Sequence, residues 1–204
     1  MIAIIDYGMG NLRSVQKAFQ RINLPAVITC DPQEISGSER IILPGVGHFA
    51  NGMEKLKEKG LDDLLSVLVL KEKKPILGIC LGMQLMTNFS EEGNVPGLGW
   101  LDARTVRFAI SGMLSPLKIP HMGWNNVEVK NEGPLFSGID LSDPFYFVHS
   151  YHVQCSNPGD VLCTTNYAQT FISGFARGNI FGVQFHPEKS HTAGLKLLQN
   201  FSTI

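Results

Sequence analysis

The sequence lacks the features that mark several large classes of proteins. Its longest apolar stretch, residues 64–70, is interrupted by Ser66 and is far shorter than the roughly 20 apolar residues that a membrane-spanning helix needs. The first apolar run contains Asp6 and is not preceded by a basic leader, so it does not resemble a signal peptide. The formal net charge is only −1, which gives no reason to expect nucleic acid or an anionic membrane as a partner.

Cysteine is also scarce, and its spacing excludes further classes. The four cysteines, at positions 30, 80, 155 and 163, form no Cys-x-x-Cys pair. This argues against a zinc site or a disulfide framework and favours the reduced thiols of a cytoplasmic protein. The chain of 204 residues is 44% hydrophobic and shows no internal repeat, low-complexity tract or interdomain linker. We therefore expect one cytoplasmic domain over residues 1–204, with no metal and no cofactor.

Apolar runs alternate with helical periodicity through the first half of the chain, which predicts an α/β fold with a mostly parallel mixed sheet flanked by helices. The predicted strands are 2–5, 26–29, 40–43 and 76–79, and the predicted helices are 12–22, 51–72 and 81–88. Asn11 is expected to cap the first helix. Short strands separated by turns over 100–185 predict antiparallel additions, and a last helix is expected over 191–201. The turn at 8–11 is not a dinucleotide fingerprint, because its third glycine position is Arg13.

Two glycines bracket one cysteine at the end of a predicted strand. Residues 76–79 are apolar, and Gly78-Ile79-Cys80-Leu81-Gly82 joins them to a segment with helical spacing. This is the thiol counterpart of the Gly-x-Ser-x-Gly elbow, in which glycines relieve clashes around a strained nucleophile. A lone cysteine is more often a buried structural residue. The glycine frame and the strand-to-helix turn favour Cys80 as a catalytic nucleophile instead.

His186 is the strongest candidate for the base among six histidines. It follows an apolar run and so stands at the carboxyl end of a predicted strand, the edge at which open α/β sheets bind ligands. Pro187 favours an extended backbone at His186, which lets Glu188 reach and orient the ring. The alternative for this tripeptide is an exposed turn. The rival bases, neither with a carboxylate nearby in sequence, are His149 and His152.

A third glycine-rich turn follows the predicted strand 40–43. Attack on an amide carbonyl produces an oxyanion, which needs backbone N–H donors aimed at it. The turn Pro44-Gly45-Val46-Gly47 allows close approach to a substrate, and its glycines, Gly45 and Gly47, make the peptide between them easy to reorient. The expected donors are the N–H of Val46 and the N–H of Leu81, although most such turns only connect two elements.

Three motifs of the chain resemble the signatures of one enzyme family. They are Pro44-Gly45-Val46-Gly47, Gly78-Ile79-Cys80-Leu81-Gly82-Met83-Gln84 and Gln184-Phe185-His186-Pro187-Glu188. In this order and spacing they resemble class I, triad-type glutamine amidotransferases. The opening segment 6–12 and His121-Met122-Gly123-Trp124-Asn125 are similar to the glutaminase subunits of imidazole glycerol phosphate synthases.

The resemblance implies a flavodoxin-like fold and hydrolysis of glutamine to glutamate and ammonia. It implies that Gln84 and Glu92 hold the substrate, with the backbone of Ser150 and Tyr151 at its other end. It also implies a heterodimer with a (β/α)8-barrel cyclase that receives the ammonia in histidine biosynthesis. The positions that match the interface with this partner are Asn11, Trp124 and Lys189.

Other interpretations stay open at this point. A paralogous subunit would feed ammonia to a synthase that modifies a sugar of a surface polysaccharide, and a stand-alone γ-glutamyl or peptide hydrolase would use the same elbow. A non-catalytic binding subunit fits less well, since Cys80, His186 and Glu188 are all intact. Gln84 has the alternative of an ordinary exposed helix residue, and Glu92 that of a solvated loop acid.

Overall fold

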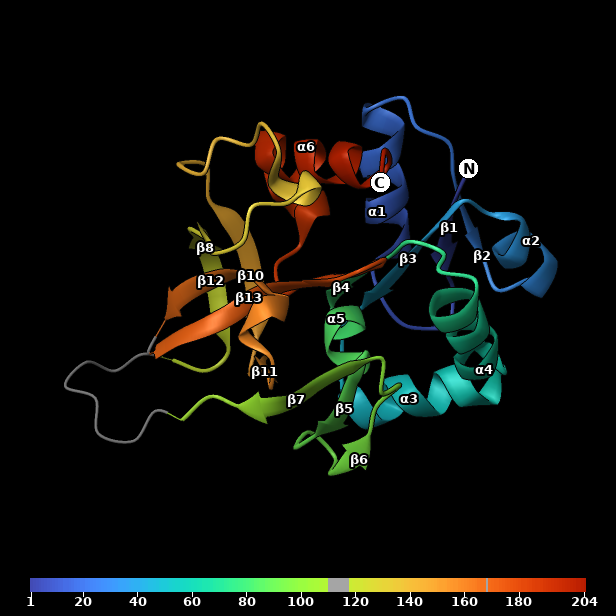
Figure 1. Cartoon of the computed structure of the whole chain (residues 1–204), viewed down its shortest axis with the longest axis horizontal. Helices are drawn as coiled ribbons and strands as arrows, with labels where there is room; N and C mark the ends of the chain where they lie inside the picture. The colour runs from blue at the N-terminus through green and yellow to red at the C-terminus, as the bar shows by residue number, and fades with distance from the viewer. Residues whose placement is uncertain (110–117, 168) are drawn as a thin grey trace.

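The computed structural model describes residues 1–109, 118–167 and 169–204 (Figure 1). Within these ranges the chain forms a 12-stranded mixed sheet and a separate two-stranded antiparallel sheet, with helices packed against the larger one. This arrangement confirms the predicted α/β class. The helices are α1 (Leu12–Arg21), α2 (Pro32–Gly37), α3 (Phe49–Glu58), α4 (Leu61–Ser66), α5 (Leu81–Leu85) and α6 (His191–Phe201), with the short segments η1 (Val67–Lys71), η2 (Pro134–Phe136), η3 (Pro158–Asp160) and η4 (Pro187–Lys189).

The strands divide the sheet into a parallel half and an antiparallel half. They are β1 (Ile2–Ile5), β2 (Ala26–Thr29), β3 (Arg40–Gly45), β4 (Ile76–Cys80), β5 (Thr87–Ser90), β6 (Val95–Pro96), β7 (Leu101–Arg107), β8 (His121–Asn125), β9 (Glu128–Val129), β10 (Phe145–His149), β11 (Tyr151–Cys155), β12 (Val161–Tyr167), β13 (Gln169–Arg177) and β14 (Ile180–Val183). The order β2-β1-β3-β4-β14 is parallel throughout, and β13 then adds to β14 in the antiparallel sense.

The register of the parallel half brings three loops to one edge of the sheet. Gly45 at the end of β3 pairs with Cys80 at the end of β4. On the other side of β4, Val183 at the end of β14 pairs with Ile79. Since ligands of open α/β sheets bind at the carboxyl ends of parallel strands, this edge is where a functional site is expected.

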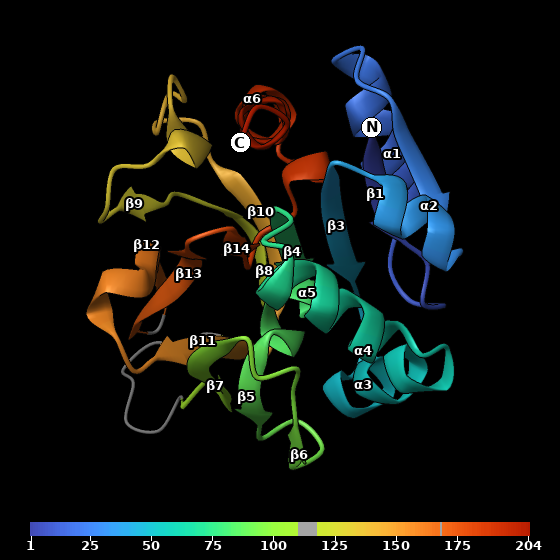
Figure 2. The same cartoon turned by 45° about the vertical axis from the view of Figure 1, so that its right-hand side comes forward.

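Two hydrophobic cores lie on opposite faces of the sheet, as the two-residue period of a strand requires. Ile2 and Ile4 of β1 pack into one core together with residues of α1 and α6. Ala3 and Ile5 alternate with them and pack into the other core, which α3, α4 and α5 cover. Figure 2 shows these two groups of helices on either side of the strands. The parallel strands are therefore buried on both faces, which holds their carboxyl ends in place.

Two of the predicted helices differ from those in the structure. The helix predicted over 51–72 is divided into α3 and the continuous pair α4 and η1, because Gly60 between α3 and α4 adopts a left-handed φ of +63°. The helix predicted over 81–88 is wrong at its end, since α5 stops at Leu85 and Thr87 already begins β5. The Thr87 hydroxyl lies 3.1 Å from that of buried Thr105 on β7, so tertiary pairing overrides the local helical periodicity.

Asn11 occupies the N-cap position of α1, but its side chain makes no capping hydrogen bond, so the predicted cap is wrong in its chemistry. The backbone oxygen of Asn11 instead accepts hydrogen bonds from the N–H groups of Ser14 and Val15 at 3.1 and 3.3 Å. The side chain of Asn11 is exposed at the start of α1. It is therefore free to contact another molecule.

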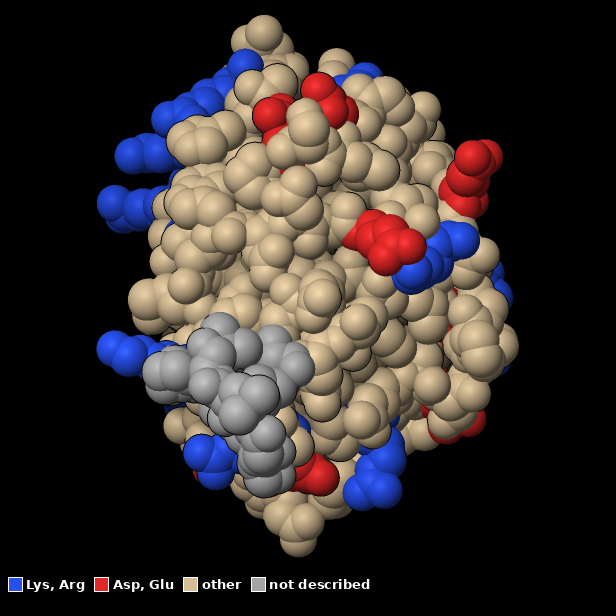
Figure 3. Space-filling model, turned by 90° about the vertical axis from the view of Figure 1, so that its left-hand side faces the viewer, with Lys and Arg blue, Asp and Glu red and all other residues tan. Residues whose placement is uncertain are grey.

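The surface agrees with the balanced composition of the chain. Figure 3 shows a face whose centre carries few charged side chains, with Lys, Arg, Asp and Glu mostly toward its margins. Among the described residues, no helix is both long and apolar enough to cross a membrane.

Candidate active site

Cys80 occupies a strained turn between β4 and α5. Its backbone has φ 54° and ψ −109°, a conformation that costs a residue with a side chain on the order of 1–3 kcal/mol. The two glycines of the motif make this turn sterically feasible. A Cβ at Gly78 would lie 2.7 Å from the amide nitrogen of Met83, and a Cβ at Gly82 would overlap the carbonyl oxygen of Leu43. The glycines thus let α5 pack directly against β3 and β4.

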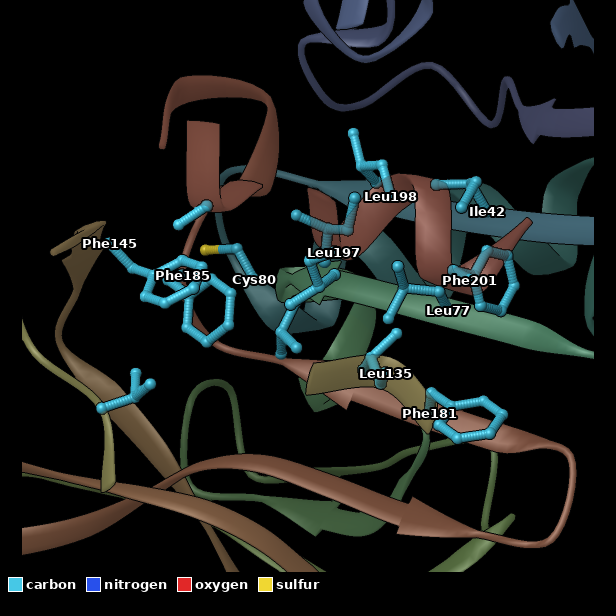
Figure 4. Close-up of a cluster of buried hydrophobic side chains, with 14 of the residues drawn as sticks. Ile42, Leu77, Cys80, Leu135, Phe145, Phe181, Phe185, Leu197, Leu198 and Phe201 are labelled. Atoms are coloured by element: carbon cyan, nitrogen blue, oxygen red, sulfur yellow. The ribbon is translucent and has the colours of Figure 1, made fainter. Parts of the chain in front are cut away.

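The Cys80 side chain lies between an apolar cluster and a small pocket. It belongs to the same buried cluster as Phe145 and Phe185, and Figure 4 shows these residues together. Among the described residues, two polar groups lie within hydrogen-bonding distance of the sulfur. The carbonyl oxygen of Val148 is 3.8 Å away, and the side-chain nitrogen of Gln184 is 3.7 Å away.

His186 and Glu188 form a buried pair beside the elbow. Nδ1 of His186 lies 2.8 Å from Oε1 of Glu188, and each side chain is only 2% exposed. The pairing predicted from their two-residue spacing is therefore present. Nε2 of His186 is buried and has no hydrogen-bond partner among the described residues. This nitrogen is the one left for proton transfer, because the carboxylate holds the proton on Nδ1.

The charge on His186 depends on its two acidic neighbours. Burial lowers the pKa of the imidazole, but the Cys80 thiolate and the Glu188 carboxylate outweigh that effect and raise the pKa to about 10. A base with this pKa stays protonated at neutral pH and is ready to give a proton to a leaving group. An imidazolium at His186 would in turn stabilise a thiolate at Cys80 during catalysis.

Removing the thiolate should lower the pKa of His186, because the imidazolium then loses its strongest stabilising charge while burial continues to oppose it. We expect the Cys80→Ala variant to deprotonate His186 at a lower pH than the unmodified chain. Titration of the ¹⁵N-labelled imidazole by NMR measures this directly. Identical titration curves for the two proteins would show that Cys80 carries no charge near His186.

The rival base His149 is placed differently. Its Nδ1 lies 2.8 Å from the carbonyl oxygen of Tyr151, which only accepts, so this nitrogen carries the proton. Its Nε2 then accepts from Nδ1 of His121, 3.0 Å away. Burial lowers the pKa of His149 to about 3 and that of His121 to about 4. Both ring nitrogens of His149 are engaged in a neutral hydrogen-bonded chain, which leaves none for catalysis.

A pocket of about 280 Å³ opens beside the Cys80 sulfur. Its volume is at the small end of the range for ligand pockets, which suits a molecule the size of an amino acid. The residues that line the pocket are Val46, Gly47, Cys80, Leu81, Gln84, Glu92, Pro120, Val148, His149, Ser150 and Tyr151. They include every residue predicted to hold the oxyanion or the substrate except Gly45. Segments far apart in the sequence thus converge on one cavity.

Gln84 and Glu92 reach this pocket from different elements. Gln84, on α5, is 4% exposed, and its Nε2 donates to the backbone oxygen of Tyr151 at 3.1 Å. Glu92 is half-buried, and its Oε2 accepts from the N–H of Phe49 at 2.8 Å, at the start of α3. Neither residue is the freely solvated side chain that the alternative interpretation described. Glu92 therefore presents a fixed carboxylate at the wall of the cavity.

The predicted oxyanion loop follows β3 directly. Gly45 packs so closely that an added Cβ would lie 2.9 Å from the Cβ of Leu81 and would overlap the hydroxyl of Tyr7. Gly47 has a φ of +112°, which favours glycine. Val46 between them is 39% exposed. The loop thus combines one tightly packed glycine with one glycine in a left-handed conformation, and the residue between them faces the pocket.

The residues matched to a partner interface lie mainly on one rim. Trp124 is 47% exposed and stacks on His191 at 4.7 Å between ring centroids. Nζ of Lys189 lies 5.2 Å from the ring centroid of Tyr146, which also packs edge-on against Trp124. Helix α1, which Asn11 precedes, contacts the segment η4 that carries Lys189. This aromatic and cationic surface adjoins the segment that holds the triad.

Two residues with polar groups near Cys80 were not assigned a role from the sequence. Gln184 is completely buried between the sulfur and Gln84. The sequence feature that points to a role for Gln184 is its polar side chain inside the apolar run before His186. Tyr7 is also completely buried, and its hydroxyl has no hydrogen-bond partner among the described residues. Burial, and secondarily the charge of Cys80, raise the pKa of the Tyr7 phenol, which therefore stays neutral.

Comparison with known proteins gives matches over nearly the whole chain. A family model described as glutamine amidotransferase class-I matches residues 3–203. The chain is 52% identical over 201 residues to the imidazole glycerol phosphate synthase subunit HisH 2 of Methanococcus maripaludis, with 98% of each chain covered. It is 45% identical over 204 residues to the imidazole glycerol phosphate synthase subunit HisH of Bdellovibrio bacteriovorus, with 100% of both covered.

Solved structures agree on the fold. A crystal structure of a glutamine amidotransferase superposes with a TM-score of 0.73 at 19% identity, covering 100% of this chain and 98% of the other. The structure of PurLQS from Thermotoga maritima gives a TM-score of 0.69 at 20% identity, covering 99% of this chain and 97% of the other. At these identities the likeness concerns the fold alone.

Proposed function

This chain belongs to the class-I glutamine amidotransferase family, and from that premise we propose that it is the glutaminase subunit of an imidazole glycerol phosphate synthase. The observation that carries the proposal is the strained Cys80 elbow beside the buried His186–Glu188 pair, opening onto a pocket sized for a small substrate. The relatives named for that synthase match the chain over nearly its whole length.

In the proposed reaction, the Cys80 thiolate attacks the side-chain carbonyl carbon of glutamine. The carbonyl oxygen becomes an oxyanion, and Nε2 of His186 gives its proton to the nitrogen that leaves as ammonia. A glutamyl thioester remains on the sulfur. His186, now neutral, takes a proton from water as that water attacks the thioester, and glutamate departs with Cys80 restored as a thiolate. Glu188 holds the ring in the required tautomer throughout.

The oxyanion requires N–H donors, and we assign them to Val46 and Leu81. Leu81 directly follows the nucleophile, as the second donor of an elbow does. Val46 lines the same pocket, and its flanking glycines lower the resistance of its peptide to reorientation. Gly45 and Gly47 therefore act by permitting this geometry.

Glutamine is proposed to bind with its α-ammonium at Glu92 and its other end along the backbone of Ser150 and Tyr151. Gln84 lies between them, one helical turn after Cys80, and already contacts the Tyr151 carbonyl. A carboxylate that pairs with an ammonium group contributes to the binding of substrate and transition state alike.

Replacing Glu92 is therefore expected to raise the KM for glutamine by roughly 10–100-fold, the worth of one charged hydrogen bond, while kcat changes little. Glu92→Gln is the informative variant, because the amide oxygen still accepts from the N–H of Phe49 and only the charge is lost. Glu92→Ala should raise KM and also destabilise the start of α3. An unchanged KM in both variants would make Glu92 a helix-capping residue only.

Ammonia released into solvent would be lost, so a partner subunit is proposed to receive it. We propose that this partner is a (β/α)8-barrel cyclase, which forms a heterodimer with the chain. It would dock on the aromatic and cationic surface formed by Trp124 and Lys189, with Asn11 at the edge of that surface. An exposed Trp is enriched in interface cores, and an exposed Lys beside it is typical of the polar rim around such a core. The four cysteines are free, which fits the cytoplasm, the compartment we propose for this pathway.

The experiment is glutamine turnover by the chain alone and in the complex with the cyclase loaded with its ribonucleotide substrate. We expect the isolated chain to hydrolyse glutamine roughly 10²–10³-fold more slowly than the loaded complex, which is the effect of one absent oxyanion donor. The unloaded complex is the control for binding without acceptor. Comparable rates in all three samples would favour a stand-alone hydrolase, and activation only by a sugar-modifying synthase would favour the paralogous pathway.

A further inference from the structure

The side chain of Gln184 connects the nucleophile to the substrate pocket. It is 0% exposed, its Nε2 lies 3.7 Å from the Cys80 sulfur, and its Oε1 accepts from Nε2 of Gln84 at 2.9 Å. Gln84 in turn donates to the backbone oxygen of Tyr151. A buried amide costs free energy unless its groups are paired, so its retention at this position calls for an explanation.

The direction of this chain of hydrogen bonds is determined at one end. The Tyr151 carbonyl only accepts, so the Gln84 atom facing it must be the amide nitrogen. The same nitrogen faces Gln184, which must present its oxygen there. The Gln184 nitrogen is therefore turned toward Cys80. Reversing either amide would bring two acceptors or two donors face to face.

The Cys80 sulfur thus has one partner for each protonation state. The Val148 carbonyl only accepts, so it suits the S–H group of a neutral thiol. The Gln184 amide donates, so it suits the thiolate that forms when His186 holds the proton. A hydrogen bond donated to the charged form of a group favours that form. Gln184 therefore biases the pair toward thiolate and limits where the sulfur lies.

We propose that Gln184 is a positioning residue that stabilises the Cys80 thiolate and holds it toward the pocket, and that Gln84 sets the orientation of Gln184. The inference rests on the proposed function, in which Cys80 is the nucleophile and Gln84 contacts glutamine. It makes one amide chain responsible for both substrate contact and nucleophile orientation.

The test is the pH dependence of Cys80 alkylation by iodoacetamide in the full chain, followed on the peptide that contains Cys80. In Gln184→Glu, the side chain still accepts from Gln84 but an ionised carboxylate cannot donate to the sulfur. Gln184→Met removes both hydrogen bonds at similar volume. We expect the pH of half-maximal alkylation rate to rise by about 1–2 units in Gln184→Met, the effect of one charge-assisted hydrogen bond. The rise should be larger in Gln184→Glu, because repulsion between the carboxylate and the thiolate adds to the lost hydrogen bond.

Steady-state kinetics in the loaded complex give a second readout. We expect kcat for glutamine to fall roughly 10–100-fold, with KM changed far less. Gln169→Met is the control, because Gln169 is a half-buried glutamine bonded to Nε2 of His152 rather than to Cys80. It should leave the alkylation profile unchanged.

An alkylation profile that stays the same in Gln184→Glu and Gln184→Met, even with a lower melting temperature, would overturn the proposal and leave Gln184 a packing residue. The alkylation assay needs neither glutamine nor a partner. A shifted profile in a chain that does not hydrolyse glutamine would therefore refute the proposed function while supporting the role of Gln184.

Discussion

Replacing Cys80 with alanine is expected to abolish glutamine hydrolysis, with kcat lowered by about 10⁵-fold or more, as for other nucleophiles that act within a triad. The fold should persist, because alanine keeps the Cβ, fits the same buried site and retains the backbone strain already accommodated at this elbow. Binding of the partner should also persist. Glutamate production in the loaded complex measures the loss of hydrolysis, and the melting temperature of the chain measures whether the fold persists.

Cys163→Ala is the matched control for this prediction. Cys163 is completely buried, pairs with the hydroxyl of Ser173 at 3.4 Å and lies outside the pocket. Burial raises its pKa to about 12, so it stays a neutral thiol. Its replacement should lower stability and leave turnover intact. Wild-type glutaminase rates in Cys80→Ala would make Cys80 structural and refute the mechanism.

The second large effect is expected for His186→Asn, which removes both the proton donor and the counter-ion of the thiolate. We expect kcat to fall by about 10⁴–10⁶-fold. Glu188→Gln should be milder, about 10³–10⁴-fold, because the amide oxygen still accepts from Nδ1 but no longer stabilises the imidazolium. Both are measured as turnover in the loaded complex.

His149→Asn provides the contrast for the base. Both ring nitrogens of His149 are hydrogen-bonded within the neutral histidine chain. We therefore expect His149→Asn to lower the melting temperature of the chain and to change kcat little. A loss of activity in His149→Asn as large as that expected for His186→Asn, together with an active His186→Asn variant, would reassign the base to His149.

The parts of the site that could be predicted from the sequence are those governed by local rules. Gly78 near the end of a predicted strand and Gly82 just after it enclose one cysteine, and this pattern predicts an elbow because few other residues fit so close to neighbouring backbone. The spacing of His186 and Glu188 predicts their pairing for a similar reason, since Pro187 restricts the backbone between them. The alternation of strands and helices predicts the parallel half of the sheet.

Other features depend on tertiary contacts and could not be predicted in this way. The end of α5 is decided by the contact of the Thr87 hydroxyl with that of Thr105 on β7, 18 residues further along the chain. The orientation of the Gln184 amide follows from a carbonyl group on a different strand, reached through Gln84. The neutral state of His149 likewise depends first on its burial and then on His121, and periodicity alone predicts neither.

The central claim is that Cys80 forms a covalent bond to the glutamyl group. It is tested most directly by rapid acid quenching of the complex of the Glu188→Gln variant with its loaded partner during glutamine turnover, followed by mass spectrometry of the peptides. Slower hydrolysis of the intermediate should let it accumulate. We predict a glutamyl group on the peptide that contains Cys80 and on no other cysteine peptide. A glutamyl group on Cys30, Cys155 or Cys163, or turnover with every cysteine unmodified, would contradict the account.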